Sequence, residues 1–200
     1  KKKFNIKTHC IYNPLNKKEI IKNSRKKINF PFFKKDTINF INIGRLVDQK
    51  DHITILKSFK KLKKDTDYKF RLLIIGRGVN KNLLKEYIKK KKLNSYIKIL
   101  NFQRNPYPYL KRADVFILSS LYEGLPNVLL ESLSLKKFII SSNCPTGPKE
   151  ILDHGKNGFL FKMGEENDLL RKIIYYFQNK KKCESLIYKG FNRLWRFDYH

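Results

Sequence analysis

Two glutamates, Glu123 and Glu131, flank a Gly-Leu-Pro turn, with seven residues between them. The apolar run at 115–118 precedes them and predicts a strand, whereas Pro126 favours the first position of a helix. In the order strand, loop, helix, unpaired backbone N–H groups and the positive end of the helix dipole lie just beyond the carboxyl end of a strand. Phosphate is the ligand expected there.

The two carboxylates indicate that the site binds a second chemical group of the ligand beside the phosphate. A rise of ~1.5 Å per residue places Glu131 below Glu123 on the ligand side of the helix. Because carboxylates accept hydrogen bonds from hydroxyl groups, the pair suggests a sugar. The alternatives are a capping carboxylate at the helix start and a solvated residue within the helix.

The Glu-x7-Glu spacing, with Gly-Leu-Pro after the first Glu, resembles the donor-site signature of glycosyltransferase family 4, whose members have the two-domain GT-B fold. Three further segments agree with that family in the same order. They are Gly-Arg-Leu-Val-Asp-Gln-Lys at 44–50, Asn-Cys-Pro-Thr-Gly-Pro-Lys-Glu at 143–150 and Gly-Lys-Asn-Gly at 155–158. The resemblance covers most of the chain after about Asn39, and it implies the C-terminal, donor-binding domain of a retaining enzyme.

The resemblance also assigns roles to residues. It implies that Arg45 and Lys50 bind the donor's diphosphate and that Glu123 contacts the transferred sugar, so these three are the expected catalytic residues. Glu131 is expected to bind the ribose hydroxyls. The other expected donor contacts are Gly44, Arg77, Phe102, Gln103, Gly124, Leu125 and Asn127. Asn101 replaces a glycine that is frequent in the family, so the base contacts of its two neighbours stay open.

Neither a metal nor a cofactor is expected at this site. The departing nucleoside diphosphate needs either a metal or fixed cations to neutralise its charge, and Arg45 and Lys50 supply the second solution. A metal would call for Asp-x-Asp at the carboxyl end of a strand, but the triplet at 65–67 predicts a solvated turn at the opposite edge. The turn at 76–78 lacks a third glycine and a following acid, which argues against a nicotinamide cofactor.

Six apolar segments alternate with helical patterns and position these residues. The expected strands are 39–43, 70–75, 97–100, 115–118, 138–141 and 159–161. Apolar stripes of helical spacing occur at 55–62 and 169–177. This alternation predicts an α/β fold, a Rossmann-like parallel sheet with helices on both faces, and the resemblance identifies it as the C-terminal half of a GT-B glycosyltransferase.

Two regions are expected along the chain. Residues 1–37 are interpreted as the end of a missing N-terminal domain and an interdomain linker, with the family's Tyr-Asn-Pro turn at 12–14. Residues 38–200 are interpreted as the donor-binding domain, with a truncated last helix. Phe30, Phe32 and Phe33 are expected to pack on the domain edge, with membrane contact as the alternative. The fragment alone should bind donor and transfer nothing.

The charge of +28 favours polyanions, although the scattered lysines also fit a coding bias toward A and T. No apolar run reaches 18 residues and no signal peptide is visible, so a cytoplasmic protein is expected, with the inner face of an anionic membrane as an additional partner.

By resemblance, the reaction is hexosyltransferase-like transfer from a UDP-sugar to a glycan or lipid-linked acceptor, in cell-envelope polysaccharide or lipopolysaccharide biosynthesis. A basic module that binds nucleic acid or membrane without catalysis, and a nucleotide-sugar epimerase of the same fold, are the alternatives. Nucleic acid is not the expected partner, because the lysines are not gathered on one element.

Overall fold

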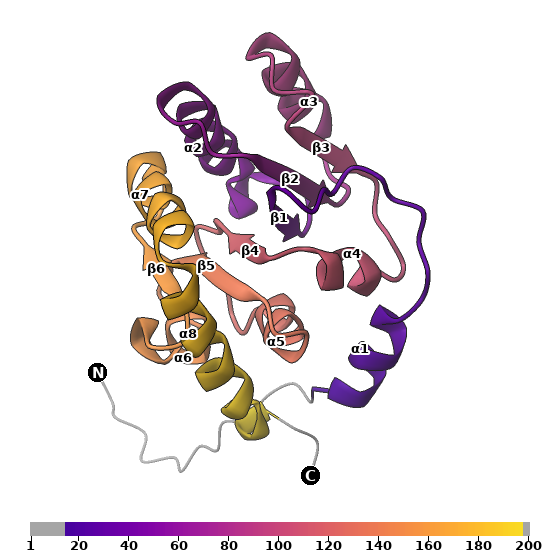
Figure 1. Ribbon diagram of the computed structural model, residues 1–200, viewed down its shortest axis with the longest axis vertical. Helices are drawn as coiled ribbons and strands as arrows, with labels where there is room; N and C mark the ends of the chain where they lie inside the picture. The colour runs from indigo at the N-terminus through magenta and orange to yellow at the C-terminus, as the bar shows by residue number, and fades with distance from the viewer. Residues whose placement is uncertain (1–14, 198–200) are drawn as a thin grey trace, which may run out of the picture.

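The computed structural model describes residues 15–197, which form one six-stranded sheet with helices on both faces (Figure 1). Every neighbouring pair of strands is parallel, and the strand order is β3-β2-β1-β4-β5-β6. The strands are β1 (Ile38–Ile43), β2 (Phe70–Ile75), β3 (Ile97–Leu100), β4 (Val115–Leu118), β5 (Phe138–Ser142) and β6 (Phe159–Phe161). The expected Rossmann-like architecture is confirmed, and each predicted strand agrees with the observed one to within one residue at either end.

The helices divide between the two faces of the sheet (Figure 1). One face carries α2 (His52–Asp65), α3 (Lys81–Lys90) and α7 (Glu166–Gln178), and the other carries α1 (Lys17–Ser24), α4 (Tyr107–Arg112) and α5 (Asn127–Ser134). The remaining helical segments are η1 (Asp48–Lys50), α6 (Pro148–Ile151), η2 (Asp153–Gly155), α8 (Lys180–Asn192) and η3 (Leu194–Phe197).

Side chains that alternate along each strand build the two hydrophobic cores. In β1, Phe40 packs into the core beneath α2 and α7, whereas the next residue, Ile41, packs into the core beneath α4 and α5. Both are fully buried, as strands covered on both faces require. The predicted stripe of α2 contributes to the first core through the buried side chains of Ile55, Leu56 and Phe59.

The strand order reverses at the centre of the sheet. The chain leaves β1 toward β2 on one side, and it returns to place β4 on the other side of β1. In open parallel sheets, ligands bind outside the carboxyl ends of the strands at such a switch point. The loops that follow β1 and β4 are therefore the segments that position a site.

Residues 15–37 pack against the second core. Leu15, Ile20 and Phe30 are buried there, and Phe32 and Phe33 pack partly buried beside them. The Leu15 N–H also donates to the Phe197 carbonyl at 3.0 Å, which ties the two ends of the described chain together. Packing of the three phenylalanines on the domain edge is thus confirmed, whereas the predicted turn at 12–14 lies outside the described residues. Within residues 15–197, no helix has both the length and the apolar character that a membrane span requires.

Candidate donor site

An ion pair joins the loops that follow β1 and β4. Lys50 Nζ lies 2.5 Å from Glu123 Oε1, and the two side chains are only 16% and 8% exposed. The Ser120 hydroxyl donates to the same carboxylate oxygen at 2.6 Å. The fold therefore brings two of the three expected catalytic residues into direct contact at the switch point, and Ser120 holds the carboxylate from the strand side.

Hydrogen bonds between the two loops fix this pair. The Ser119 hydroxyl donates to the Lys50 carbonyl at 2.6 Å, and the Leu121 N–H donates to the Gln49 carbonyl at 2.8 Å. The Gln49 side chain donates to the Tyr122 carbonyl at 2.8 Å and accepts from the exposed Arg45 guanidinium at 3.1 Å. Arg45, the third expected catalytic residue, is thus connected to the Lys50–Glu123 pair through Gln49.

The loop after β5 braces the Gly-Leu-Pro turn from behind. Gly147 has φ +81°, and a Cβ at this position would collide with the Gly124 carbonyl and with the Pro126 ring. The Thr146 hydroxyl donates to the Glu123 carbonyl. Gly124 itself faces open space on the side where a Cβ would stand. The turn is therefore supported on its protein side and open on the other.

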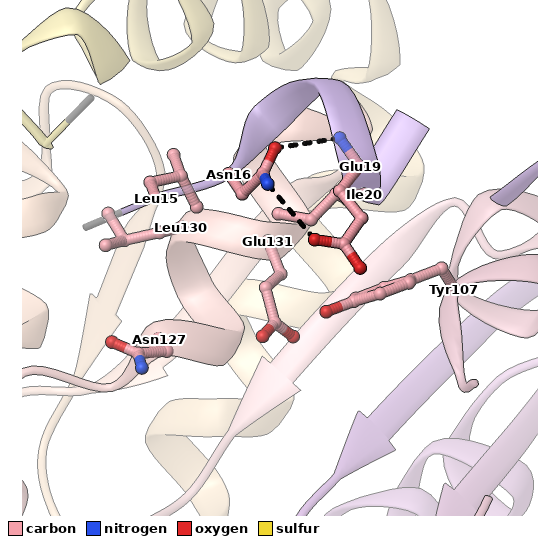
Figure 2. A pocket seen from close by; sticks show the side chains of 8 residues that line it. All are labelled: Leu15, Asn16, Glu19, Ile20, Tyr107, Asn127, Leu130 and Glu131. Atoms are coloured by element: carbon pink, nitrogen blue, oxygen red, sulfur yellow. Dashed lines mark hydrogen bonds between the residues drawn. The ribbon is translucent and has the colours of Figure 1, made fainter. Parts of the chain in front are cut away.

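The helix after this turn begins one residue later than expected. Pro126 caps α5 with φ −74° and ψ 97°, and the first helical residue is Asn127. Asn127 and Glu131 lie one turn apart on α5 and line the same cavity. The cavity holds about 220 Å³, and Figure 2 shows its lining residues, which are Leu15, Asn16, Glu19, Ile20, Tyr107, Asn127, Leu130 and Glu131.

Glu131 is held largely out of water in this cavity. Burial raises the pKa of its carboxyl, whereas a hydrogen bond with the Tyr107 hydroxyl acts in the opposite direction. Burial and the nearby Glu131 carboxylate raise the pKa of Tyr107 to about 12, so the phenol stays protonated at neutral pH. Tyr107 therefore acts as the donor toward Glu131. Ligand hydroxyls that enter the cavity meet a carboxylate whose position is already fixed.

The residues expected beside the base come from the ends of β2 and β3. The Arg77 guanidinium lies over the Phe102 ring at 5.2 Å, and Phe102 is 58% exposed. Gln103 donates to the Asn101 carbonyl at 3.1 Å. The Leu46 N–H donates to the Arg77 carbonyl at 2.9 Å, which joins this surface to the loop after β1. An exposed aromatic face beside a guanidinium can stack on a planar base.

The predicted residues thus lie along the carboxyl ends of the strands, where they form small groups of residues in contact. Lys50 and Glu123 touch each other, Glu131 shares a cavity with Asn127, and Arg77 lies on Phe102. Gly44 lies beside Lys50, whose side-chain carbons would be 3.9 Å from a Cβ at that position, and Leu125 packs partly buried on the second core. The Asp65–Asp67 triplet runs from the last residue of α2 into the segment before β2, so it lies near the amino end of that strand, and only Asp65 departs from the predicted turn by ending the helix.

Sequence reasoning missed Tyr107, Glu19 and a role for Ser120. Tyr107 begins a six-residue helix, and Glu19 lies on a helix that has no clear apolar stripe in the sequence. Only the position of Ser120, two residues after the buried strand at 115–118, gave a signal. Within residues 15–197, no group of three His, Cys, Asp or Glu side chains is arranged to hold a metal ion, and metal independence stays a prediction.

Comparisons with known proteins agree with this geometry. Residues 23–193 match the family model described as glycosyl transferases group 1. The chain is 45% identical over 118 residues to an uncharacterized glycosyltransferase of Methanocaldococcus jannaschii, covering 59% of this chain and 29% of the relative. It is 28% identical over 158 residues to the N-acetylgalactosamine-N,N'-diacetylbacillosaminyl-diphospho-undecaprenol 4-alpha-N-acetylgalactosaminyltransferase of Campylobacter jejuni, covering 79% of this chain and 42% of the relative.

Solved structures share the fold. The crystal structure of Anabaena Alr3699/HepE in complex with UDP superposes with a TM-score of 0.73 at 19% identity, covering 82% of this chain and 45% of that one. The chain thus spans less than half the length of these three proteins.

Proposed function

The chain belongs to the group 1 glycosyl transferases, and we propose that it is the donor-binding part of a family 4 enzyme that transfers a sugar from a nucleotide-sugar with retention of configuration and without a metal. In this proposal Arg45, Lys50 and Glu123 contact the reacting end of the donor.

The Lys50–Glu123 pair is the observation that carries the proposal. Departure of the nucleoside diphosphate places negative charge on its oxygens, and a fixed ammonium stabilises that charge where no metal does so. Lys50 is anchored by Glu123 at 2.5 Å beside the backbone N–H groups of the turn and the start of α5. These groups together form the diphosphate site, and Arg45 approaches it from the loop after β1.

The remaining residues bind the rest of the donor. The Glu131 carboxylate accepts hydrogen bonds from the ribose, and the base lies against Phe102 and Arg77. Glu123 also reaches the transferred sugar, while backbone groups of Gly124, Leu125 and Asn127 line the path between sugar and phosphate. This order follows the strand ends from β4 toward β3.

A UDP-sugar is the proposed donor and a glycan or lipid-linked sugar the proposed acceptor. The Anabaena neighbour was solved with UDP, and the Campylobacter relative is named for a diphospho-undecaprenol substrate. An enzyme acting on such acceptors would work at the inner face of a membrane in cell-envelope polysaccharide assembly. This chain alone is proposed to bind the donor, with the acceptor groups supplied by the rest of such an enzyme.

Calorimetric titration of the chain with UDP, GDP and ADP tests the proposal, at about 0.3 M salt and with a chelator present. We expect saturable binding of one nucleotide, weakened about tenfold or more by Arg45→Ala and by Glu131→Ala. Lys57→Ala, an exposed change on α2, is the control for loss of one positive charge. Binding that requires added Mg²⁺ would contradict metal independence. A folded chain that binds none of the three nucleotides would contradict the donor-site proposal.

A further inference from the structure

The cavity beside α5 differs in charge from the rest of this basic chain. The sequence contains 45 Lys and Arg residues, yet none of the eight described residues that line the cavity is Lys or Arg. Its polar groups are the carboxylates of Glu19 and Glu131, the amides of Asn16 and Asn127, and the phenol of Tyr107. Two carboxylates without a cation repel phosphate and accept hydrogen bonds from hydroxyl groups. The cavity is therefore suited to a neutral diol.

We propose that Glu19 is a second ribose-binding residue: Glu19 and Glu131 each accept one of the two vicinal ribose hydroxyls of the bound nucleotide, with Tyr107 between them as a positioning residue. This inference rests on the proposed function and adds α1 to the nucleotide site. It predicts that the chain distinguishes ribose from deoxyribose through two carboxylates on different helices.

The position of Glu19 supports this role. Asn16 caps α1, its side chain accepts from the Glu19 N–H at 3.0 Å, and its amide donates to Glu19 Oε2 at 3.1 Å. Figure 2 shows the Glu19 carboxylate on the Tyr107 side of the cavity, opposite Glu131. Buried Leu15 and Ile20 anchor α1 on either side of Glu19. The second carboxylate is thus held in place before any ligand arrives.

Tyr107 couples the two carboxylates. Figure 2 shows the Tyr107 hydroxyl pointing toward the Glu131 carboxylate, and the charges of both Glu131 and Glu19 raise the pKa of Tyr107. A phenol can donate only one hydrogen bond, so it leaves carboxylate oxygens free to accept from ligand hydroxyls. The volume of about 220 Å³ suits one five-membered sugar ring, so we assign the cavity to the ribose of the nucleotide and not to the transferred sugar.

The test compares UDP with its 2′-deoxy and 3′-deoxy analogues by calorimetry on the whole chain. The variants are Glu19→Gln, Glu131→Gln and, as a matched control, Glu86→Gln on the exposed side of α3. Glutamine at position 19 can still accept from the Asn16 amide, so α1 should stay folded. We expect Glu19→Gln to weaken UDP binding about tenfold and to abolish discrimination against one deoxy analogue, whereas Glu131→Gln abolishes it against the other.

Several outcomes would overturn the inference. If Glu19→Gln binds UDP as tightly as Glu86→Gln does, Glu19 is not part of the site. The same conclusion follows if Glu19→Gln loses affinity by the same factor for UDP and for both deoxy analogues. An effect seen with a UDP-sugar but not with UDP would assign the cavity to the transferred sugar. These results leave the proposed function standing if Glu131→Gln and Arg45→Ala still weaken UDP binding. If the unaltered chain binds no nucleotide, the proposed function and this inference fail together.

Discussion

Lys50 has the most direct proposed contact with the donor diphosphate. Its ammonium is 2.5 Å from Glu123 and its side chain is only 16% exposed, so it is fixed before ligand binds. We predict that Lys50→Met weakens UDP binding about 10- to 100-fold, because a hydrogen bond to a charged group contributes ~1.5–3 kcal/mol. Uridine, which has no phosphate, should bind Lys50→Met and the unaltered chain equally well. Calorimetry with both ligands measures the difference.

Lys57→Met is the control for this substitution, because it removes one lysine from the exposed side of α2. It should leave UDP affinity within about twofold. A parallel loss of uridine and UDP affinity in Lys50→Met would show that the substitution disturbs the fold around Glu123, whose carboxylate then lacks its cation. In that case Lys50 would be a structural residue.

His52 makes the stability of the fold depend on pH. Its Nε2 lies 3.0 Å from Asn42 Oδ1, while the Asn42 amide donates to the Ile117 carbonyl at 2.9 Å. Nε2 therefore carries the proton, and Nδ1 is buried without a partner among the described residues. Burial, followed by the nearby Lys50, lowers the pKa of His52 from 6.5 to about 4. The folded chain thus favours the neutral imidazole.

The stability that depends on neutral His52 is fully present above pH 6.5 and is lost as pH falls toward 4, because the unfolded chain takes up the proton first. The loss reaches up to ~3 kcal/mol at ~1.4 kcal/mol per pKa unit. We predict that His52→Gln, whose amide can still donate to Asn42, flattens the dependence of unfolding free energy on pH between 6.5 and 4. Urea unfolding at several pH values measures it, with exposed His154→Asn as control. Parallel curves for His52→Gln and the unaltered chain would contradict the prediction.

At the scale of elements, the loop from β5 to α6 holds the donor loop in position. Gly147→Ala would place a Cβ against the Gly124 carbonyl and Pro126, at a backbone φ of +81°. We predict that it lowers the unfolding free energy by about 3 kcal/mol and weakens UDP binding at least about tenfold, because the Gly-Leu-Pro turn must move.

Gly155→Ala provides a matched control, because its φ is +91° and a Cβ there meets nothing within 4 Å. It should carry the backbone strain alone, ~1–2 kcal/mol, and bind UDP normally. Thermal unfolding and calorimetry separate the two effects. Equal UDP affinity in both variants would show that the donor loop does not depend on the loop behind it.

Strands and short helices differ in how well the sequence predicts them. β2, for example, is apolar except for Arg71 and ends just before Gly76, so its limits were predicted correctly. By contrast, α1 has eight residues, and only Ile20 among its apolar side chains is buried, so it depends on packing against α4 and α5. A helix that owes its stability to tertiary contacts leaves little periodic signal in its own sequence.

The same difference in sequence signal separates the site residues that were predicted from those that were missed. Arg45, Lys50, Glu123 and Glu131 follow or begin strongly patterned elements and matched a family signature, so each could be named in advance. The contact between Lys50 and Glu123, 73 residues apart, needed the strand order. Glu19 and Tyr107 belong to short helices, and their shared cavity exists only after α1 docks.

At the scale of the whole molecule, positive charge opposes folding. The net charge of +28 is spread over the chain, so most pairs of charged side chains repel one another. We predict that raising NaCl from about 20 mM to about 0.5 M raises the melting temperature by several degrees, since the screening length falls from about 20 Å to about 4 Å. Differential scanning calorimetry measures this. A melting temperature that falls with salt would mean that ion pairs such as Lys61–Glu166 outweigh the repulsion.

The salt dependence of binding also distinguishes a donor pocket from a general basic surface. A polyanion such as duplex DNA that neutralises several lysines loses affinity steeply, with a slope near −0.9 per phosphate contacted in a plot of log K against log salt. The UDP phosphates would meet only Lys50 and Arg45 as cations, while the ribose binds to carboxylates and the base lies against Phe102 and Arg77, away from the phosphates. We therefore predict a slope for UDP no steeper than about −2 between 0.1 and 0.5 M NaCl, against several units for DNA. A UDP slope as steep as that of DNA would place the nucleotide on the general basic surface, and the chain would then be a polyanion-binding module.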